Sequence, residues 1–226
     1  MIGKDKLEIE TFPMGDLGCN CSLIYSPKSK EAIIIDPGND AVSLMKLIKE
    51  RQLTVKLLLH THAHFDHIGQ SQIIHEQTGA KRLLHKDDLF LYEGLPQQGM
   101  FFGVKMDVPS PLEGYLNNEE SFGFSETLSL EDQSLKQFIK VLHTPGHTPG
   151  SVCFYTDCFK EPVLFSGDTL FQSSIGRTDL PGGDTDKILV SIKQRLYTLP
   201  DETNVICGHG PQTRIFEEKR NNPFIR

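Results

Sequence analysis

The chain has 226 residues, of which 38% are hydrophobic, so it can bury a sizeable core, and we expect one domain over residues 1–226. Thirty Asp and Glu against 23 Lys and Arg give a net charge of −7, which argues against nucleic acid as a partner. No segment approaches the ~20 apolar residues that span a membrane, and the charged start of the chain does not resemble a signal peptide. These properties predict a soluble, cytoplasmic protein.

The first part of the chain predicts a sheet with one covering helix. Apolar or alternating residues favour four strands, at residues 6–12, 20–26, 31–35 and 55–59. Asp40 is predicted to cap an amphipathic helix that ends near Arg51. The predicted buried stripe of this helix consists of Val42, Met45, Leu47 and Ile48.

The segment Thr-His-Ala-His-Phe-Asp-His at residues 61–67 directly follows the fourth predicted strand. Side chains leave a strand end with a period of two, so His62 and His64 can point toward one spot. Asp66 and His67 can then turn toward a second spot beside it. Imidazole and carboxylate together suit zinc, iron or manganese better than calcium or magnesium, which prefer oxygen ligands. This motif therefore predicts a metal site.

The residues around the motif have less direct roles. His60 lies one strand repeat before His62 and is expected to end the strand or support the ligands. A short amphipathic helix is predicted next; it closes at Gly79, and its apolar residues are Ile68, Ile73 and Ile74.

Residues 86–125, here called the flap, follow a predicted strand at residues 82–85. Glycines and prolines interrupt a series of aromatic residues in this segment, which favours a helical start and then an irregular excursion. Long loops of this kind often carry function. The flap could form a wall of a substrate pocket, or it could pack over the molecule without touching a ligand.

The second half of the chain is again rich in strands. They are predicted at residues 126–130, 136–143, 151–156, 163–166 and 203–207. Two helices are expected, one at residues 184–198 and one near residues 212–219. The first of them should bury Ile188, Leu189, Ile192 and Leu196. Two strand-rich halves that each carry helices suggest two sheets packed face to face with helices outside.

Three further polar residues lie just past predicted strands in this half, each beside glycine. They are His147, Asp168 and His209. Glycine neighbours let side chains or backbone crowd toward one centre. Together with the motif at residues 61–67, these positions complete a candidate metal centre.

Five cysteines are present, an odd number without a Cys-x-x-Cys pair, which predicts reduced thiols. They are Cys19, Cys21, Cys153, Cys158 and Cys207. Cys207 lies two residues before His209 and could approach the metal, but a lone thiol is not typical of cysteine-rich zinc sites.

Four motifs, in order and in spacing, resemble the metallo-β-lactamase superfamily over nearly the whole chain. They are THAHFDH at 61–67, TPGHTPGS at 144–151, GDTLF at 167–171 and GHGP at 208–211. SSIGRTDLPGGD at 173–184 and NNPF at 221–224 resemble more narrowly a single-domain branch of the glyoxalase II-like hydrolases. The chain ends soon after His209, so the helical domain that binds glutathione in two-domain relatives is not expected.

The resemblance implies an α/β (α+β) fold, a four-layer αββα sandwich with mostly antiparallel or mixed sheets. It also implies a site for two divalent ions at one edge, with zinc preferred and iron or manganese as alternatives. One ion would bind His62, His64 and His147. The other would bind Asp66, His67 and His209, and Asp168 would bridge the two.

The resemblance further implies hydrolysis of a thioester, S-lactoylglutathione or a related hydroxyacyl thioester, by attack of a metal-bound hydroxide. Asp66 or Asp168 would orient this hydroxide and so count as catalytic residues. Arg177 could bind a substrate carboxylate through a bidentate contact, or it could form an ordinary surface ion pair. Three residues are candidates for orienting the ligands: Asp36, Thr61 and His143.

Other functions stay open. The main alternative is a persulfide dioxygenase with one iron held by His62, His147 and Asp168, which the chain resembles in GRTD at 176–179. A β-lactamase ranks lower because no export signal is seen. A phosphodiesterase or nuclease would be expected to show added basic or histidine motifs. A metal-binding scaffold without turnover is disfavoured by the complete ligand set. The native metal, the parts of the substrate and the oligomeric state are left open.

Overall fold

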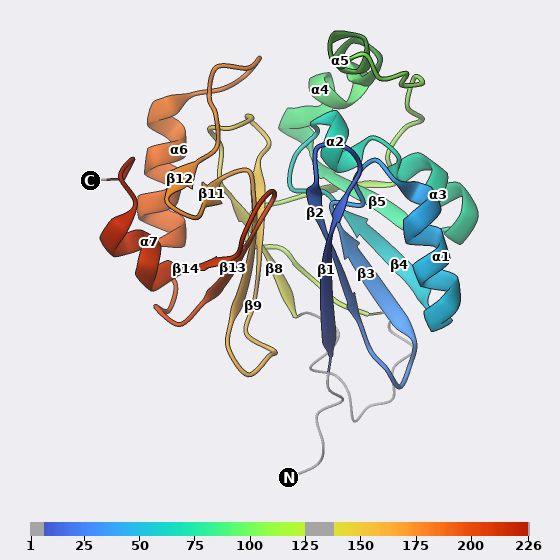
Figure 1. Ribbon diagram of the computed structural model, residues 1–226, viewed down its shortest axis with the longest axis horizontal. Coiled ribbons are helices and arrows are strands. Elements are labelled where there is room, and N and C mark those ends of the chain that lie inside the picture. The colour runs from blue at the N-terminus through green and yellow to red at the C-terminus, as the bar shows by residue number, and fades with distance from the viewer. Residues whose placement is uncertain (1–6, 125–137, 226) are drawn as a thin grey trace.

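The computed structural model describes residues 7–124 and 138–225. Two six-stranded sheets pack face to face, and helices cover the outer face of each sheet (Figure 1). The α/β fold with four αββα layers is therefore confirmed. Within the described residues, no helix combines the length and the apolar character needed to cross a bilayer.

The first sheet has the strand order β1-β2-β3-β4-β5-β6. The strands are β1 (Glu8–Met14), β2 (Cys19–Tyr25), β3 (Glu31–Ile35), β4 (Thr54–Leu59), β5 (Lys81–His85) and β6 (Gly114–Leu116). β1, β2 and β3 pair antiparallel, whereas β3 to β6 run parallel. The strands predicted before the flap are found within two residues of their expected bounds, whereas β6 was not predicted from the sequence. Because β3 and β4 are parallel, the turn after each of them reaches the same edge of the sheet.

The second sheet has the order β14-β13-β10-β9-β8-β7. Its strands are β7 (Ser121–Phe122), β8 (Ile139–His143), β9 (Val152–Thr156), β10 (Val163–Gly167), β13 (Asn204–Cys207) and β14 (Thr213–Arg214). Within the described residues of this sheet, β10 and β13 pair parallel and the other neighbouring strands pair antiparallel. A separate ribbon joins β11 (Leu170–Phe171) and β12 (Ser174–Ile175). The predicted strand at 126–130 and the start of the one at 136–143 lie outside the described residues.

Helices cover the outer face of each sheet. The first sheet carries α1 (Ala41–Arg51) and α3 (Ser71–Thr78), and the second carries α6 (Thr185–Ser191), a π-helical continuation (Ile192–Leu196) and α7 (Ile215–Asn221). The short helix α2 (Phe65–Ile68) lies at the edge of the sandwich, below the flap (Figure 1). The helix predicted from Ile68 to Gly79 is present as α3 but begins only at Ser71, and Ile68 is the last residue of α2. α3 ends at Gly79 as predicted, since this glycine adopts the left-handed conformation. Ile73 is exposed, contrary to its predicted place in the buried stripe.

Helix α1 begins where the sequence predicts. The carboxylate of Asp40 accepts a hydrogen bond of 3.0 Å from the amide of Ser43. The predicted buried stripe is partly wrong, because Val42 is 82% exposed and Leu47 is only partly buried. The residues that face the sheet are Ala41, Leu44, Met45 and Ile48. The predicted and the observed residues both have helical spacing, so the packing of the helix against the sheet decides which set is buried.

Replacing Asp40 by alanine is expected to lower the free energy of unfolding by about 1 kcal/mol, because the Ser43 amide loses its side-chain acceptor. Asp40→Asn keeps an oxygen at this position and should cost less, so it serves as the matched control. Urea denaturation followed by circular dichroism measures both variants. Equal stability of Asp40→Ala and the unchanged protein would contradict the capping role.

Three apolar clusters hold the layers together. The central one lies between the sheets and combines residues such as Ile33 and Leu59 with Phe154 and Phe165. One outer cluster joins the first sheet to α1 and α3, and the other joins the second sheet to α6 and α7. Each sheet is therefore buried on both faces, which explains why its strands read as nearly continuous apolar runs.

The flap is more regular than expected. Its described part contains a 3₁₀ turn (Lys86–Asp88), α4 (Leu89–Glu93), α5 (Leu95–Phe102), β6 and β7. Leu91, Tyr92 and Leu95 pack on Phe65 and Ile68 in a fourth apolar cluster. In Figure 1, α4 and α5 stand above one edge of the sandwich. The flap thus rests directly on the segment that carries the histidine motif.

Candidate metal centre

The predicted ligands meet at one edge of the sandwich. The motif at residues 61–67 follows β4, and the later ligands follow β8, β10 and β13. These four strands all end at the edge that the flap covers (Figure 1). The structure brings together all seven side chains: His62, His64, Asp66, His67, His147, Asp168 and His209.

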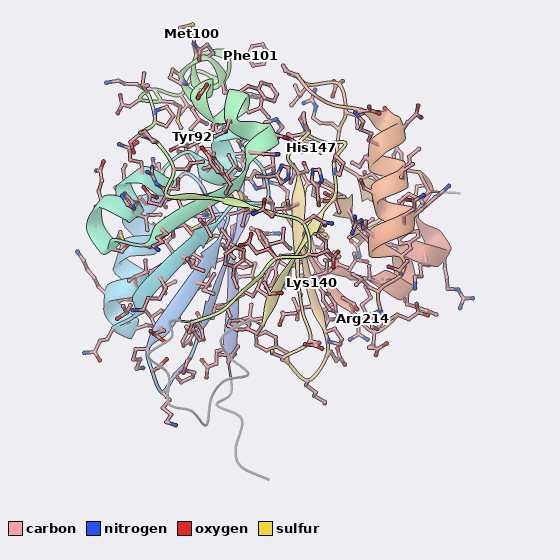
Figure 2. All side chains as sticks on the ribbon, turned by 180° about the vertical axis from the view of Figure 1, so that it is seen from behind. Tyr92, Met100, Phe101, Lys140, His147 and Arg214 are labelled. Atoms are coloured by element: carbon pink, nitrogen blue, oxygen red, sulfur yellow. The ribbon has the colours of Figure 1, made fainter. Side chains whose placement is uncertain are left out.

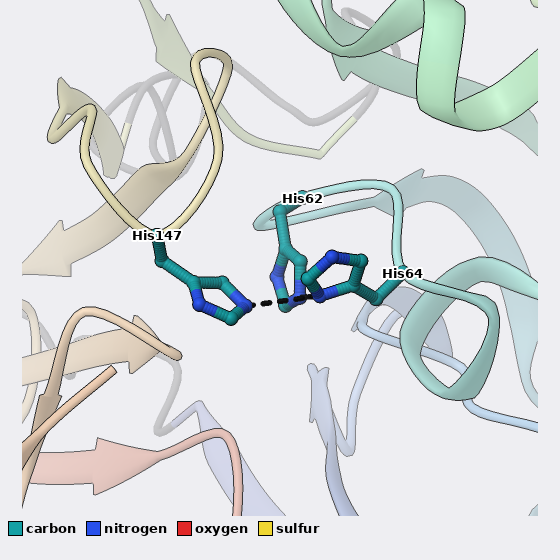
Figure 3. Close-up of side chains that lie close together, drawn as sticks. All are labelled: His62, His64 and His147. Atoms are coloured by element: carbon teal, nitrogen blue, oxygen red, sulfur yellow. Dashed lines mark hydrogen bonds between the residues drawn. The ribbon is translucent and has the colours of Figure 1, made fainter. Parts of the chain in front are cut away.

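Three imidazoles form the first group of donors. His64 Nδ1 lies 3.0 Å from His62 Nε2 and 2.9 Å from His147 Nε2. Figure 3 shows the three rings converging from the motif loop and from the loop after β8. The rings of His62 and His147 are steeply inclined to each other, at 81°. Their ring nitrogens therefore approach a common point from different directions.

The second group contains one carboxylate and two imidazoles. His209 Nε2 lies 3.1 Å from His67 Nε2 and 3.1 Å from Asp66 Oδ2. Asp66 Oδ2 is 3.7 Å from His67 Nε2. This donor set of two nitrogens and one oxygen is typical of zinc, iron or manganese.

Asp168 lies between the two groups. Its Oδ2 is 3.6 Å from His147 Nε2 in the first group, and its Oδ1 is 3.4 Å from His67 Nε2 in the second. Oδ1 is buried and receives no hydrogen bond from the described residues. A buried carboxylate oxygen without a donor is costly unless a cation compensates it. This arrangement fits the predicted role of Asp168 as a bridging ligand.

The hydrogen bonds of the outward-facing ring nitrogens show which nitrogens of these histidines are free to bind a metal. His147 Nδ1 donates to the carbonyl of Arg177 over 2.7 Å, and His209 Nδ1 donates to the carbonyl of Leu17 over 3.1 Å. A neutral imidazole that donates from Nδ1 carries a lone pair on Nε2. Both inward-facing nitrogens are thus metal acceptors, so the residues fit a pair of divalent cations.

Asp36 and Thr61 support the ligands, as the sequence analysis expected. Asp36 accepts hydrogen bonds from the amide and hydroxyl of Thr61 and, over 2.9 Å, from Nδ1 of His67. Because the Thr61 hydroxyl donates to Asp36, it accepts from His62 Nδ1 over 3.0 Å. The Asp36 carboxylate therefore fixes which ring nitrogen faces the metal groups. It does so directly for His67 and through the Thr61 hydroxyl for His62. Asp36 has a left-handed backbone with φ of 49°, an uncommon conformation for a residue with a side chain.

Burial and charge differ between the two groups. Burial lowers the pKa of His62, and it lowers the pKa of His64 to about 3, so both rings stay in the neutral form that binds metal. Burial alone would also lower the pKa of His67, but the negative groups facing it, among them Asp168 and Asp66, outweigh burial and raise it. The second group therefore attracts positive charge, which a divalent cation supplies.

Three other predicted candidates lie outside the two donor groups. His60 Nδ1 donates to the carbonyl of Leu83, so this residue ends its strand as expected. His143 was expected to support the ligands, but its Nε2 donates to the carbonyl of Pro149 and its ring stacks on His85. The side chain of Cys207 packs in the cluster between the second sheet and its helices and belongs to neither donor group.

Two residues that position the ligand loops were not predicted from the sequence. Buried Asp88 accepts hydrogen bonds from the Ala63 amide, the Thr148 hydroxyl and the Gly150 amide. It thereby joins the loop of His62 and His64 to the loop of His147. The only available signal was a pair of aspartates just after a predicted strand, which does not reveal contacts with residues 25 to 62 positions away.

Gln98 in α5 is the second missed residue. Its side-chain oxygen accepts from the amide of Phe65 over 3.1 Å, and its amide nitrogen donates to the carbonyls of Ala63 and Leu91. The flap is therefore tied to the motif loop by hydrogen bonds as well as by apolar packing.

The loop of His209 approaches the centre unusually closely. A Cβ atom at Gly208 would lie 2.1 Å from Asp168 Oδ1, so no residue larger than glycine fits there without a shift. Asn20 fixes the same loop by donating from its side chain to the carbonyls of Cys207 and Gly210, both over 2.9 Å. The glycine that the sequence analysis noted beside His209 thus has a steric reason.

A cavity of about 570 Å³ opens onto the metal groups. His64, Asp66, His147 and Asp168 contribute to its lining. Apolar residues form most of the remaining wall: Leu17, Phe65, Leu91, Phe101, Phe102, Leu180 and Pro181. Of the two roles considered for the flap, the structure favours the wall of a pocket. The volume is within the range of small-molecule sites.

Arg177 also lines this cavity, but its side chain is engaged. Its guanidinium forms a bidentate ion pair with Asp179, with N–O distances of 2.7 and 2.8 Å. Its carbonyl accepts the hydrogen bond from His147 described above. Contact of Arg177 with a substrate carboxylate stays a prediction.

Residues 14–209 match a family model described as the metallo-beta-lactamase superfamily. The chain belongs to this superfamily. It is 39% identical to a protein of Haemophilus influenzae named hydroxyacylglutathione hydrolase GloC, and the alignment covers 97% of this chain and 98% of that relative. The family match and this relative support a metal-binding hydrolase.

Two solved structures of the superfamily resemble the chain over almost its whole length. The BLEG-1 B3 metallo-beta-lactamase is 40% identical, with a TM-score of 0.83 and coverage of 96% of this chain and 99% of that one. The protein TTHA1623, solved in a di-iron-bound form, is 36% identical, with a TM-score of 0.79 and coverage of 96% and 100%. These similarities support a site for divalent metal and leave the identity of the metal open.

Proposed function

We propose that this superfamily member hydrolyses a thioester, with S-lactoylglutathione or a related hydroxyacyl thioester as the first candidate substrate. The observation that carries the proposal is the pair of donor groups joined by Asp168 at the wall of an open cavity. The similarity to a relative named hydroxyacylglutathione hydrolase adds support for the substrate class. A cytoplasmic location stays a prediction.

The two donor groups would each hold one cation. His62, His64 and His147 would hold one cation, and the second group would hold the other. We propose zinc, with iron or manganese as alternatives. Two such cations would activate water at neutral pH and polarise the carbonyl of the substrate. Asp168, which faces both groups, would offer a carboxylate oxygen to each.

Asp66 and Asp168 are the proposed catalytic residues. Both carboxylates face the cavity, so either could accept a hydrogen bond from the attacking water and orient it toward the carbonyl carbon. A thiolate leaves readily, so the reaction does not depend on a strong general acid. Arg177 would attract a carboxylate of the substrate at the rim, if it exchanges Asp179 for the ligand.

Hydrolysis of S-lactoylglutathione by protein loaded separately with zinc, iron or manganese tests the proposal. Metal content measured on the same samples should be near two ions per chain, and turnover should rise with occupancy. Two metals without turnover of any thioester in a panel would contradict the proposed reaction. One iron together with oxygen uptake on glutathione persulfide would instead support the dioxygenase alternative.

A β-lactam ring is a second candidate substrate. The observation that favours it is the 40% identity to a structure described as a B3 metallo-beta-lactamase. Assay of a penicillin and of S-lactoylglutathione with the same metal-loaded sample compares the two candidates directly. A kcat/KM that is higher for the penicillin would place amide hydrolysis first.

A further inference from the structure

Three aromatic rings lead from the metal groups to the surface of the flap. Phe65, which lies between His64 and Asp66 in the chain, stacks on Phe102 with ring centroids 4.8 Å apart. Phe102 in turn meets the edge of Phe101 at 5.1 Å. Phe65 is buried, Phe102 is 47% exposed and Phe101 is 80% exposed. We call these three residues the aromatic stack.

The aromatic stack forms one wall of the cavity. All three of its residues line the cavity, and Leu91 extends the apolar surface behind them. Figure 2 shows Phe101 at the outer end of the flap, above the edge at which His147 lies. Single exposed apolar residues are common, but exposed aromatic rings that stand together at the wall of a cavity often mark a binding site.

The position of the aromatic stack is fixed relative to the metal groups. Gln98, one turn before Phe102 in α5, accepts from the amide of Phe65 and donates to the carbonyl of Ala63. Gly99 lets α5 pack tightly on the returning chain, since a Cβ there would lie 2.4 Å from a side-chain carbon of Met106. The apolar wall is therefore preorganised, which reduces the entropy lost when it binds an apolar group.

The loop on the other side of the cavity has a different character. Arg177 is the one cation among the described residues that line the cavity, and it is already paired with Asp179. Glutathione carries two carboxylates. In a glutathione thioester, the glutathione part would therefore lie on this side of the cavity, next to Arg177. The acyl part of the thioester would then face the aromatic stack.

We infer that the aromatic stack is an acyl pocket and that the enzyme prefers thioesters with an aromatic or bulky apolar acyl group. The inference rests on the proposed thioester hydrolysis and specifies its substrate class. A small acyl group such as lactoyl would leave Phe101 and Phe102 in contact with water. A phenyl ring in its place would cover them and gain both apolar burial and ring contacts.

S-Mandeloylglutathione and S-lactoylglutathione test this inference, since they differ only in a phenyl ring in place of a methyl group. We expect a kcat/KM about tenfold higher for the mandeloyl ester. Phe101→Ala and Phe102→Ala should each reduce the ratio of the two kcat/KM values severalfold, through a lower kcat/KM for the mandeloyl ester. Phe101 is exposed, so its replacement leaves folding intact.

Met100→Ala is the matched control. Met100 precedes Phe101 in α5 and is 82% exposed, but it is not among the residues that line the cavity. The variant should keep the full preference for the mandeloyl ester. A preference that is absent in the unchanged protein, or that survives in the Phe101→Ala, Phe102→Ala double variant, would overturn the inference.

Product binding separates failure of the pocket from failure of the proposed reaction. Calorimetric titration of mandelate and lactate into zinc-loaded protein requires no turnover. Tighter binding of mandelate that is lost in Phe102→Ala would support the pocket even if no thioester is hydrolysed. Equal binding of the two acids, together with equal turnover of the two esters, would reject the pocket while leaving thioester hydrolysis in place.

Discussion

Asp168→Ala is expected to leave the protein with fewer than two metals per chain and to lower kcat/KM for the best thioester roughly 1,000-fold. Asp168 is the residue that faces both donor groups, at 3.4 Å from His67 Nε2 and 3.6 Å from His147 Nε2. Without it, the positive charges of two cations would lie close together with one negative charge fewer between them. Elemental analysis and steady-state kinetics measure the two effects.

Asp157→Ala is a suitable control for this variant, because it removes an exposed carboxylate of the turn after β9, at the end of this strand opposite to the His147 loop. It should keep full metal content and activity. His62→Ala should resemble Asp168→Ala, since His62 belongs to the first group and its ring also packs against His67. Undiminished turnover in either ligand variant would contradict the assigned centre.

Asp88→Ala is expected to lower the free energy of unfolding by about 3 kcal/mol, although Asp88 touches no metal. The change leaves three donors without their acceptor: the Ala63 amide, the Thr148 hydroxyl and the Gly150 amide. Burial raises the pKa of Asp88 above the usual range of a carboxyl, while these donors oppose the shift. The loops beside His147 and His62 would lose their common support, and metal affinity should fall about 10- to 100-fold.

The neighbouring carboxylate gives a matched control for that prediction. Asp87 is exposed, and Asp87→Ala should change stability by less than about 0.5 kcal/mol. Urea denaturation of the metal-free proteins isolates the structural effect, and competition with a zinc chelator measures affinity. If Asp88→Ala unfolds at the same urea concentration as Asp87→Ala and binds zinc equally well, the bridging role of Asp88 is wrong.

Features that depend on neighbours in the chain could be predicted from the sequence. The cap at Asp40, the strand before the histidine motif and the glycine that ends α3 each have a local signature, and the structure confirms them. The meeting of the seven candidate ligands also follows from a local rule, because each lies just past a strand end. The resemblance in four motifs then supplied the grouping around two metals.

Features that depend on distant partners could not be predicted in this way. Val42 has the same helical spacing as the residues that are buried, and only contact with the sheet separates them. β6 has three residues, too few to show a period. Asp88 and Gln98 act through hydrogen bonds to segments that are far away in the chain, and the ring of His143 stacks on the distant His85.

Each donor group takes ligands from both strand-rich halves of the chain. His62 and His64 come from the first half and His147 from the second, while Asp66 and His67 are joined by His209. Cation binding is thus thermodynamically linked to the docking of one half on the other. For each ion, every tenfold rise in free metal above the dissociation constant would add about 1.4 kcal/mol to the stability of the docked state. The metal supply of the cell would then set how long the folded protein survives as well as how fast it works.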